Sequence, residues 1–364
     1  MTRSLSEQPT NGISSLGSEG MPLFFSRISQ ARPSRVYDTY WKFAAERQEV
    51  FFRRFEGVTG TLTRDPIINK HKFTNAYRAS DRVSQYLIRW VIYEGDQSAQ
   101  EIFFRTLLFK FFNKIDTWHL LRDQLGEVCW RSYSFRRYDA ILTEALSNGQ
   151  RIYSAAYIMP TARGIGDQTR KHRTHLKLLE RMIHEGTPER IAASRTMREA
   201  FEILKQYPMM GNFLAYQFVT DLNYSVLTNF SEMEFIVPGP GARDGLRKCF
   251  EDYGDLSESD LIKLMADRQE MDFDRLGLSF RSLWGRTLQL IDCQNLFCET
   301  DKYARLAHPE VQGLSGRTRI KQVYRPTAES IDYWYPPKWG LNNAVASDRA
   351  RHVSALEKCG DISR

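Results

Sequence analysis

FEILKQYPMMGNFLAYQFVTDLNY, residues 201–224, reads as two helices with apolar faces joined by a tight hairpin. Pro208 and Gly211 occupy the turn, and Asn212 starts the second helix. A glycine there exposes backbone N–H groups at a helix start, where the helix dipole also attracts an anion. The stretch therefore predicts a helix-hairpin-helix whose turn binds a DNA phosphate. An ordinary helical corner is the alternative, because Met209 stands where the usual hairpin has its first glycine.

Helical periodicity extends from the hairpin in both directions. Apolar residues recur three and four positions apart between about 35 and 325, and alternating strand patterns are nearly absent. This pattern predicts a mostly α-helical body of two lobes that meet near residues 160–200. Residues 1–34, rich in Ser, Gly and Pro, are expected to form a disordered tail. Residues 326–364 are expected to form a C-terminal extension that frays after about residue 345.

Composition limits the class of protein. The formal net charge of +7 suits a nucleic-acid partner, although an ordinary basic protein has a similar excess. Five cysteines without a CxxC pair predict free thiols in a reducing compartment. No stretch reaches the roughly 20 apolar residues of a membrane span, and the N-terminus lacks the apolar core of a secretory signal. We therefore expect a cytoplasmic monomer that binds double-stranded DNA and carries neither metal nor cofactor.

Carboxylates follow the hairpin at a spacing that suggests chemistry. In DNA glycosylases with this hairpin, a catalytic acid follows a reference position near the hairpin at a fixed spacing. In the lyase-type enzymes, that reference position is a lysine. That position is Phe213 here, so the amine for Schiff-base chemistry is missing. The same count leads to Glu232, with Glu234 close by and Asp221 earlier, inside the second helix. A carboxylate can stabilise positive charge on a deoxyribose and orient a water, so these three are the candidate catalytic acids, with Glu232 first. A solvated or capping role is the alternative for each.

A Gly-Pro-Gly turn comes directly after these acids. Gly239 and Gly241 lie in PGPGAR, residues 238–243, and Arg243 and Arg247 follow them. Exposed N–H groups beside two arginines predict a phosphate clamp next to the acid. The turn lacks the GxxxxGK order of a nucleotide-binding P-loop, and no such motif occurs in the sequence.

Two polar clusters on otherwise apolar helices are the candidates for a base-binding pocket. The first, in KFTNAYRASDRVSQYL (72–87), comprises Asn75, Tyr77, Arg78 and Asp81. The second, in QNLFCETDKYAR (294–305), comprises Asn295, Glu299, Asp301, Lys302 and Tyr303. Buried polar side chains are costly unless their partners are fixed, so internal bracing of the fold is the alternative for both clusters. They can share one pocket only if the first and last helices of the body meet at the hairpin.

These segments resemble a known family in their order along residues 35–325. The matching stretches are FTNAYRASDR, FFRTLLFKFFNKIDTW, FVTDLNYS, PGPGARDGL and QNLFCETDKY. The sequence is similar to the helical domain of the 5-hydroxymethyluracil DNA kinases, also called alpha-glutamyl/putrescinyl thymine pyrophosphorylases. The resemblance implies a two-lobed fold related to the helix-hairpin-helix DNA glycosylases, and a substrate among the hypermodified pyrimidines of phage DNA. In the kinase members a P-loop domain performs phosphoryl transfer beside the helical domain.

Three functions are compatible with this sequence. Because it holds no P-loop, the first expectation is a monofunctional DNA N-glycosylase, a hydrolase that flips and excises a bulky 5-hydroxymethyl-derived pyrimidine. Glucosylated 5-hydroxymethylcytosine in phage DNA would be such a base, and the resulting abasic sites would serve anti-phage defence. The second is a transferase or pyrophosphorylase that acts on the 5-hydroxymethyl substituent while the base stays attached. The third is a reader that binds modified DNA without chemistry.

Overall fold

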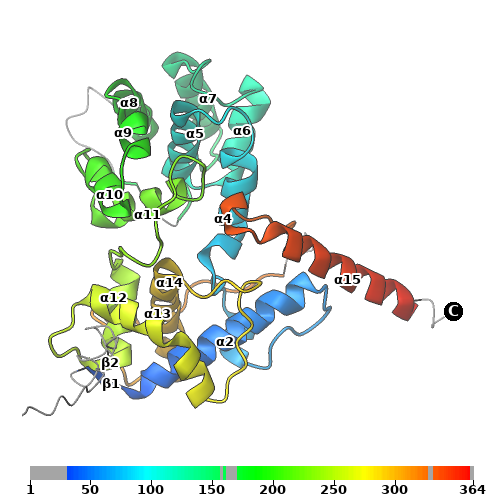
Figure 1. Ribbon diagram of the computed structural model, residues 1–364. Helices are drawn as coiled ribbons and strands as arrows, with labels where there is room; N and C mark the ends of the chain where they lie inside the picture. Colours follow the sequence, from blue (N-terminus) through cyan, green and yellow to red (C-terminus); the bar gives the residue numbers. More distant parts are fainter. Residues whose placement is uncertain (1–30, 156–158, 161–169, 327–330, 361–364) are drawn as a thin grey trace, which may run out of the picture.

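The computed structural model is mostly helical (Figure 1). It describes residues 31–155, 159–160, 170–326 and 331–360. Within these residues the strands form one small two-stranded sheet, so the predicted mostly α-helical class is confirmed. None of the described helices is both long and apolar enough to cross a membrane. The predicted N-terminal tail lies almost wholly outside the described residues.

The lower lobe in Figure 1 contains segments from both halves of the chain. Its elements are β1 (Arg32–Pro33), α2 (Arg35–Phe55), α3 (Pro66–Lys70), α12 (Pro240–Cys249), β2 (Phe250–Asp252), α13 (Glu258–Arg275) and α14 (Leu290–Ala307). Helix α14 is central, because α2, α3, α12 and α13 all pack against it. Local signals define the helix starts: the Ser34 side chain caps α2, and Ser257 and Asp260 form a capping box at α13.

The upper lobe is built around one helix that is apolar on nearly all sides. Its elements are the π-helix η3 (Leu87–Ile92), α5 (Ala99–Phe112), α6 (Ile115–Leu125), α7 (Phe135–Ser147), α8 (Lys171–His184), α9 (Thr187–Ala192), α10 (Met197–Lys205) and α11 (Asn212–Leu222). Helix α5 contacts η3, α6, α8, α9 and α11. Phe103, Phe104 and Leu107 on α5 are completely buried, as expected for a helix without a polar face.

The chain crosses between the lobes twice. It rises through the short 3-10 turn η2 (Arg78–Ser80) and α4 (Arg82–Tyr86), and it returns through residues 223–239. The upper lobe is therefore inserted between α3 and α12, and the prediction that the lobes meet near residues 160–200 is wrong. Periodicity identifies helices but does not say which of them pack together, so it could not show that α2 joins α12 and α14.

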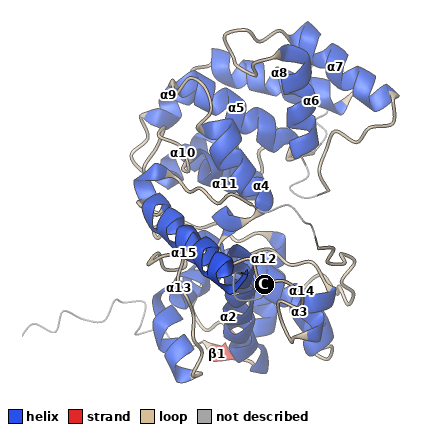
Figure 2. Cartoon of the chain, turned by 90° about the vertical axis from the view of Figure 1, so that its right-hand side faces the viewer, coloured by secondary structure: helices blue, strands red, loops and turns tan. Residues whose placement is uncertain are grey.

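The C-terminal segment is ordered further than predicted. The 3-10 turn η4 (Pro337–Trp339) leads into α15 (Asn342–Gly360), which extends from the lobe junction (Figure 2). The sequence predicted fraying after about residue 345, and helix α15 continues past that position. Buried Asp348 accepts hydrogen bonds from Trp284 Nε1 and Arg281 Nη2, both at 2.9 Å, and these bonds hold the first turns of α15 against the lower lobe.

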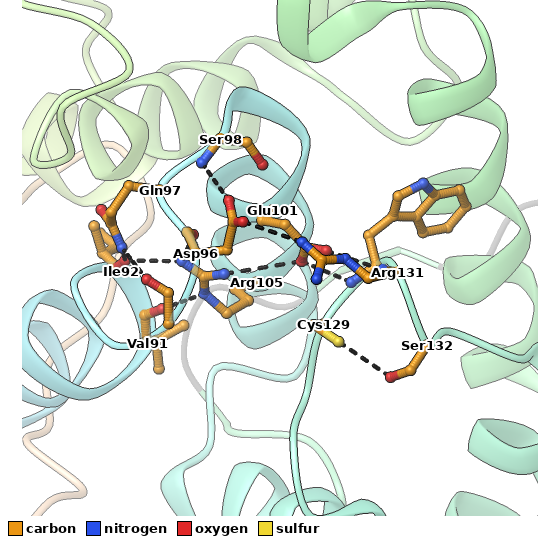
Figure 3. A network of polar contacts seen from close by, with 12 residues as sticks. Val91, Ile92, Asp96, Gln97, Ser98, Glu101, Arg105, Cys129, Arg131 and Ser132 are labelled. Atoms are coloured by element: carbon orange, nitrogen blue, oxygen red, sulfur yellow. Dashed lines mark hydrogen bonds and ion pairs between the residues drawn. The ribbon is translucent and has the colours of Figure 1, made fainter.

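A polar network holds the end of the π-helix η3 in the upper lobe (Figure 3). Buried Arg105 donates to the carbonyl oxygens of Val91 at 2.8 Å and Ile92 at 3.1 Å, which helix geometry leaves without partners. Glu101, one turn before Arg105 on α5, accepts the backbone N–H of Arg131 at 2.9 Å. The network thus ties η3 and the loop before α7 to the central helix of the lobe.

Candidate functional site at the lobe junction

Two helices joined by a short turn, α10 and α11, lie at the place where the sequence predicted a helix-hairpin-helix. Helices α10 and α11 pack against each other, and Gly211 is the N-cap of α11. Met209 adopts φ +70°, the left-handed conformation that a glycine takes most easily, so it fills the conformational role of the missing first glycine. Pro208 is half-buried, whereas Gly211 and Asn212 are exposed. Gly211 offers no side-chain cap to α11, and the helix starts at two exposed residues, Gly211 and Asn212.

The predicted Gly-Pro-Gly clamp serves helix packing instead. Pro240 is the first residue of α12, and the Gly239 N–H donates to Gln294 Oε1 on α14 at 3.2 Å. A side chain on Gly239 would collide with the Phe213 ring, and one on Gly241 would collide with Cys298 on α14. The glycines therefore let α12 approach its neighbours closely, and the Gly239 N–H is already occupied.

The two arginines of the predicted clamp point outward. Arg243 is exposed and forms an ion pair with Glu258, with Nε 2.7 Å from Oε2. Arg247 is also exposed and has no ion pair within the described part of the chain. Both arginines remain candidates for a DNA contact from α12, but without help from the N–H groups of the Gly-Pro-Gly turn.

A buried ion network joins the two lobes; we call it the sealed network, comprising Arg78, Lys110, Asp221, Tyr224 and Asp292. Asp221 on α11 lies 2.8 Å from Arg78 Nη1 and 3.2 Å from Lys110 Nζ on α5. Arg78 Nη1 also donates to Tyr224 Oη at 2.8 Å, and the Arg78 N–H donates to Asp292 Oδ1 on α14 at 2.8 Å. Arg78 thus connects an upper-lobe acid with a lower-lobe acid.

Burial sets the electrostatics of the sealed network. It lowers the pKa of Lys110, with Asp221 opposing the shift, and it raises the pKa of Asp292 to about 6. The Asp221 side chain is 0% exposed and that of Arg78 is 2% exposed. A ligand could reach Asp221 only if the network opened, so the fold places this candidate acid in a structural position.

A second group at the junction is partly exposed; we call it the open cluster, comprising Glu232, Arg286, Lys338 and Trp339. Glu232 Oε1 accepts from Arg286 Nη2 at 2.7 Å, and the two side chains are 9% and 18% exposed. The Arg286 guanidinium lies 3.8 Å from the centre of the Trp339 ring. The Trp339 ring in turn meets Tyr224 of the sealed network edge-on, with ring centres 5.7 Å apart. The first-ranked acid therefore lies beside a cation and an aromatic ring.

The C-terminal segment supplies Lys338 and Trp339 to the open cluster, and Lys338 bonds to the loop before Glu232. Lys338 Nζ donates to the carbonyl oxygens of Ser225 at 3.1 Å and Thr228 at 2.6 Å, in the loop that leads from α11 to Glu232. Desolvation lowers the pKa of Lys338 to about 8, although nearby Glu232 favours the charged form. Glu234, the second-ranked acid, is exposed and outside this group.

The first predicted pocket segment divides between the junction and the lower lobe. Tyr77 reaches the open cluster, because its hydroxyl donates to the Arg286 carbonyl at 2.6 Å. Asn75 instead accepts from buried Arg47 at 3.2 Å, and its own N–H donates to Asp81 at 2.8 Å. Burial raises the pKa of Asp81 to about 7. Asn75 and Asp81 thus brace the loop against α2.

The second predicted segment meets the first, as a shared pocket would require. Glu299 accepts the Thr74 N–H at 3.0 Å and lies 2.7 Å from Lys302 Nζ. This contact links the second segment to the loop that Asn75 and Asp81 brace against α2. Among the described residues, it does not involve Glu232.

The rest of the second segment points in other directions. Asp301 is buried against Lys248 of α12 at 3.0 Å and also pairs with Arg305. Tyr303 donates to Asp65 at 2.6 Å, and Asn295 is half-buried on α14. The structure therefore gives most of these residues a bracing position, the alternative already open for them.

Sequence reasoning missed four residues of the two groups at the junction: Lys110, Asp292, Arg286 and Trp339. Lys110 had a signal, since it is a charge within the apolar run FFRTLLFKFF. Asp292 also had one, because it stands three residues after Gln289, with which it forms a capping box. Arg286 and Trp339 had none, because only the tertiary fold brings them together beside Glu232.

Comparison with known proteins agrees with the order of these segments. The model of the family described as 5-hmdU DNA kinase, helical domain, matches residues 34–313. The chain is similar to the 5-hmdU DNA kinase of Bacillus phage SP10, with 24% identity over 290 residues. The alignment covers 74% of this chain and 45% of that relative, so the chain spans about half the relative's length. No solved structure matches.

These findings overturn the first functional expectation. A DNA kinase adds a phosphoryl group, so the predicted N-glycosylase, with its hydrolase chemistry, base excision and abasic product, is wrong. The spacing of an acid after a hairpin indicates where a carboxylate lies and does not indicate which bond reacts. The comparisons favour the second expectation, chemistry on the 5-hydroxymethyl substituent. The chain belongs to the family of 5-hmdU DNA kinase helical domains.

Proposed function

We propose that this chain binds DNA containing a 5-hydroxymethylated pyrimidine and presents the hydroxymethyl oxygen for phosphoryl transfer while the base stays attached. The observation that carries the proposal is the position of Glu232. It is a partly exposed carboxylate at the lobe junction, paired with Arg286, which lies over Trp339, in a chain of the 5-hmdU DNA kinase helical-domain family. The flat Trp339 ring and the charged pair suit a polar aromatic base.

Glu232 has the chemistry that an acceptor hydroxyl requires. As the new O–P bond forms, the hydroxymethyl O–H must lose its proton, and a positioned carboxylate can accept it. The bond between the phosphoryl group and its leaving group breaks in the same transfer. Arg286 orients Glu232 through their contact at 2.7 Å. We assign the acceptor side of the reaction to this chain and the phosphoryl donor to a nucleotide-binding domain acting with it.

The hairpin supplies the DNA contact in this proposal. The exposed N–H groups at Gly211 and Asn212 suit one phosphate of the backbone, and this contact carries no base preference. We also propose that the two-lobed body with this hairpin is a helix-hairpin-helix glycosylase-like fold that has been adapted to substituent chemistry.

The proposal is tested by binding to two duplexes that differ in one base, 5-hydroxymethyluracil against thymine. Fluorescence anisotropy should show tighter binding to the modified duplex. Glu232→Gln should remove this preference, whereas Glu234→Gln, an exposed acid two residues away, should keep it. Equal affinity of the unaltered chain for both duplexes would contradict the proposal. A preference without label transfer from γ-labelled ATP, even with a nucleotide-binding domain supplied, would instead indicate a reader.

A further inference from the structure

A row of exposed cations crosses the lower lobe away from the hairpin; we call it the basic ridge. It comprises Lys70, Lys72, Arg317, Arg319, Lys321 and Arg325. All six side chains are exposed, and none has an ion pair among the residues that the structure describes. Neither contributing stretch, 66–80 or 311–325, contains an acidic residue.

The backbone of the ridge is held in place. His71 and Val323 form an antiparallel bridge, in which the Lys72 N–H donates to Gln322 at 3.1 Å and the Tyr324 N–H donates to Lys70 at 3.0 Å. These bonds bring Lys70 and Lys72 alongside the residues that adjoin Lys321 and Arg325.

Two further contacts fix the approach to the bridge. The Ser315 N–H donates to buried Asp244 of α12 at 2.7 Å, and Arg305 of α14 donates to the Arg319 carbonyl at 3.1 Å. The main chain is therefore anchored to two helices of the lobe core. Like charges held together on an anchored backbone repel one another, and a polyanion removes that repulsion.

We propose that the basic ridge is a second DNA-binding surface, which contacts the phosphates of duplex DNA at a distance from the modified base. The identity of this polyanion rests on the proposed function. The family match ends at residue 313, so four of the six cations lie beyond the matched region. Phosphate contacts carry no sequence information, so the ridge adds affinity for any duplex and leaves the choice of base to the open cluster.

The test compares two triple variants of the full chain with equal loss of charge. Arg317→Gln, Arg319→Gln and Lys321→Gln remove three ridge cations. Arg136→Gln, Arg137→Gln and Arg151→Gln remove three exposed cations of the upper lobe as the control. The affinity for an unmodified duplex is measured between about 50 and 200 mM salt. The ridge variant should lower the slope of log affinity against log salt by about 2.7, since each phosphate contact contributes about 0.9, and the control should leave it unchanged.

A second variant and a second ligand keep the outcome decisive. Lys70→Gln with Lys72→Gln should lower the slope by about 1.8 without touching residues 317–325. An unchanged slope in both ridge variants, or an equal loss in the control, overturns the proposal. A loss confined to a duplex RNA of the same length also overturns it. The preference for 5-hydroxymethyluracil over thymine should survive in every ridge variant, so failure of the ridge and failure of the open cluster are distinguishable.

Discussion

The sealed network and the open cluster are neighbours with similar chemistry and different accessibility. Each pairs a carboxylate with an arginine, has a lysine beside it and includes an aromatic ring, and Tyr224 and Trp339 touch edge to edge. In the sealed network Asp221 is 0% exposed, whereas Glu232 and Arg286 of the open cluster keep 9% and 18% of their side-chain surface. We therefore infer that the buried network joins the lobes, whereas the partly exposed cluster can replace one of its internal contacts with a contact to a ligand.

This difference has an energetic basis. Charges removed from water are tolerated only when every partner stays in place, so a buried network is sensitive to the loss of one member. A partly solvated pair gains less from its contact and also loses less when a ligand replaces one partner. We therefore expect changes in the sealed network to act on stability, and changes in the open cluster to act on ligand binding.

The largest expected effect is that of Asp221→Asn. The substitution leaves Arg78 and Lys110 buried without their anion, so the free energy of unfolding should fall by about 3–5 kcal/mol in urea denaturation. Lys110→Met is the matched control, because it leaves the pair of Arg78 and Asp221 intact and should cost clearly less. A loss below about 1 kcal/mol for Asp221→Asn would show that water reaches this network and would break the comparison.

The next effect concerns pH and Asp292, the lower-lobe acid of the sealed network. Its native pKa of about 6 is above the unfolded value of about 3.9, so between these values the folded chain binds more protons than the unfolded chain. Its contribution to stability therefore falls as pH rises through that window. Asp292→Asn removes this dependence, so its stability relative to the unaltered chain should improve by about 2 kcal/mol from pH 4 to pH 7. If the difference in unfolding free energy between the variant and the unaltered chain is the same at pH 4, 5.5 and 7, burial does not raise the pKa of Asp292.

The smallest expected effect is that of Trp339→Ala on binding. It removes the ring under Arg286, a contact worth about 1–2 kcal/mol, so affinity for the 5-hydroxymethyluracil duplex should fall about 5- to 30-fold. Trp90→Ala is the matched control, because Trp90 also lies against an arginine, Arg89, but is 44% exposed in the upper lobe. Equal losses in both variants would mean that the open cluster has no special role.

Short-range sequence patterns were sufficient to predict the elements that depend on near neighbours. The apolar run of α5, the hairpin of α10 and α11, and the helical class all follow from spacing and turn chemistry that a few consecutive residues express. The ordered motifs also resembled the correct family. The prediction of a glycosylase reaction was wrong because a fold does not specify which bond reacts on it.

The tertiary structure alone decided which polar residues meet and which of them a ligand can reach. Asp221 and Glu232 are eleven positions apart and both are candidate acids in the sequence, yet one is enclosed by Arg78 and Lys110 and the other is partly exposed beside Arg286. Trp339, from the far end of the chain, reaches Arg286, the partner of Glu232. Burial and long-range pairing depend on how helices pack, and local periodicity carries no information about that packing.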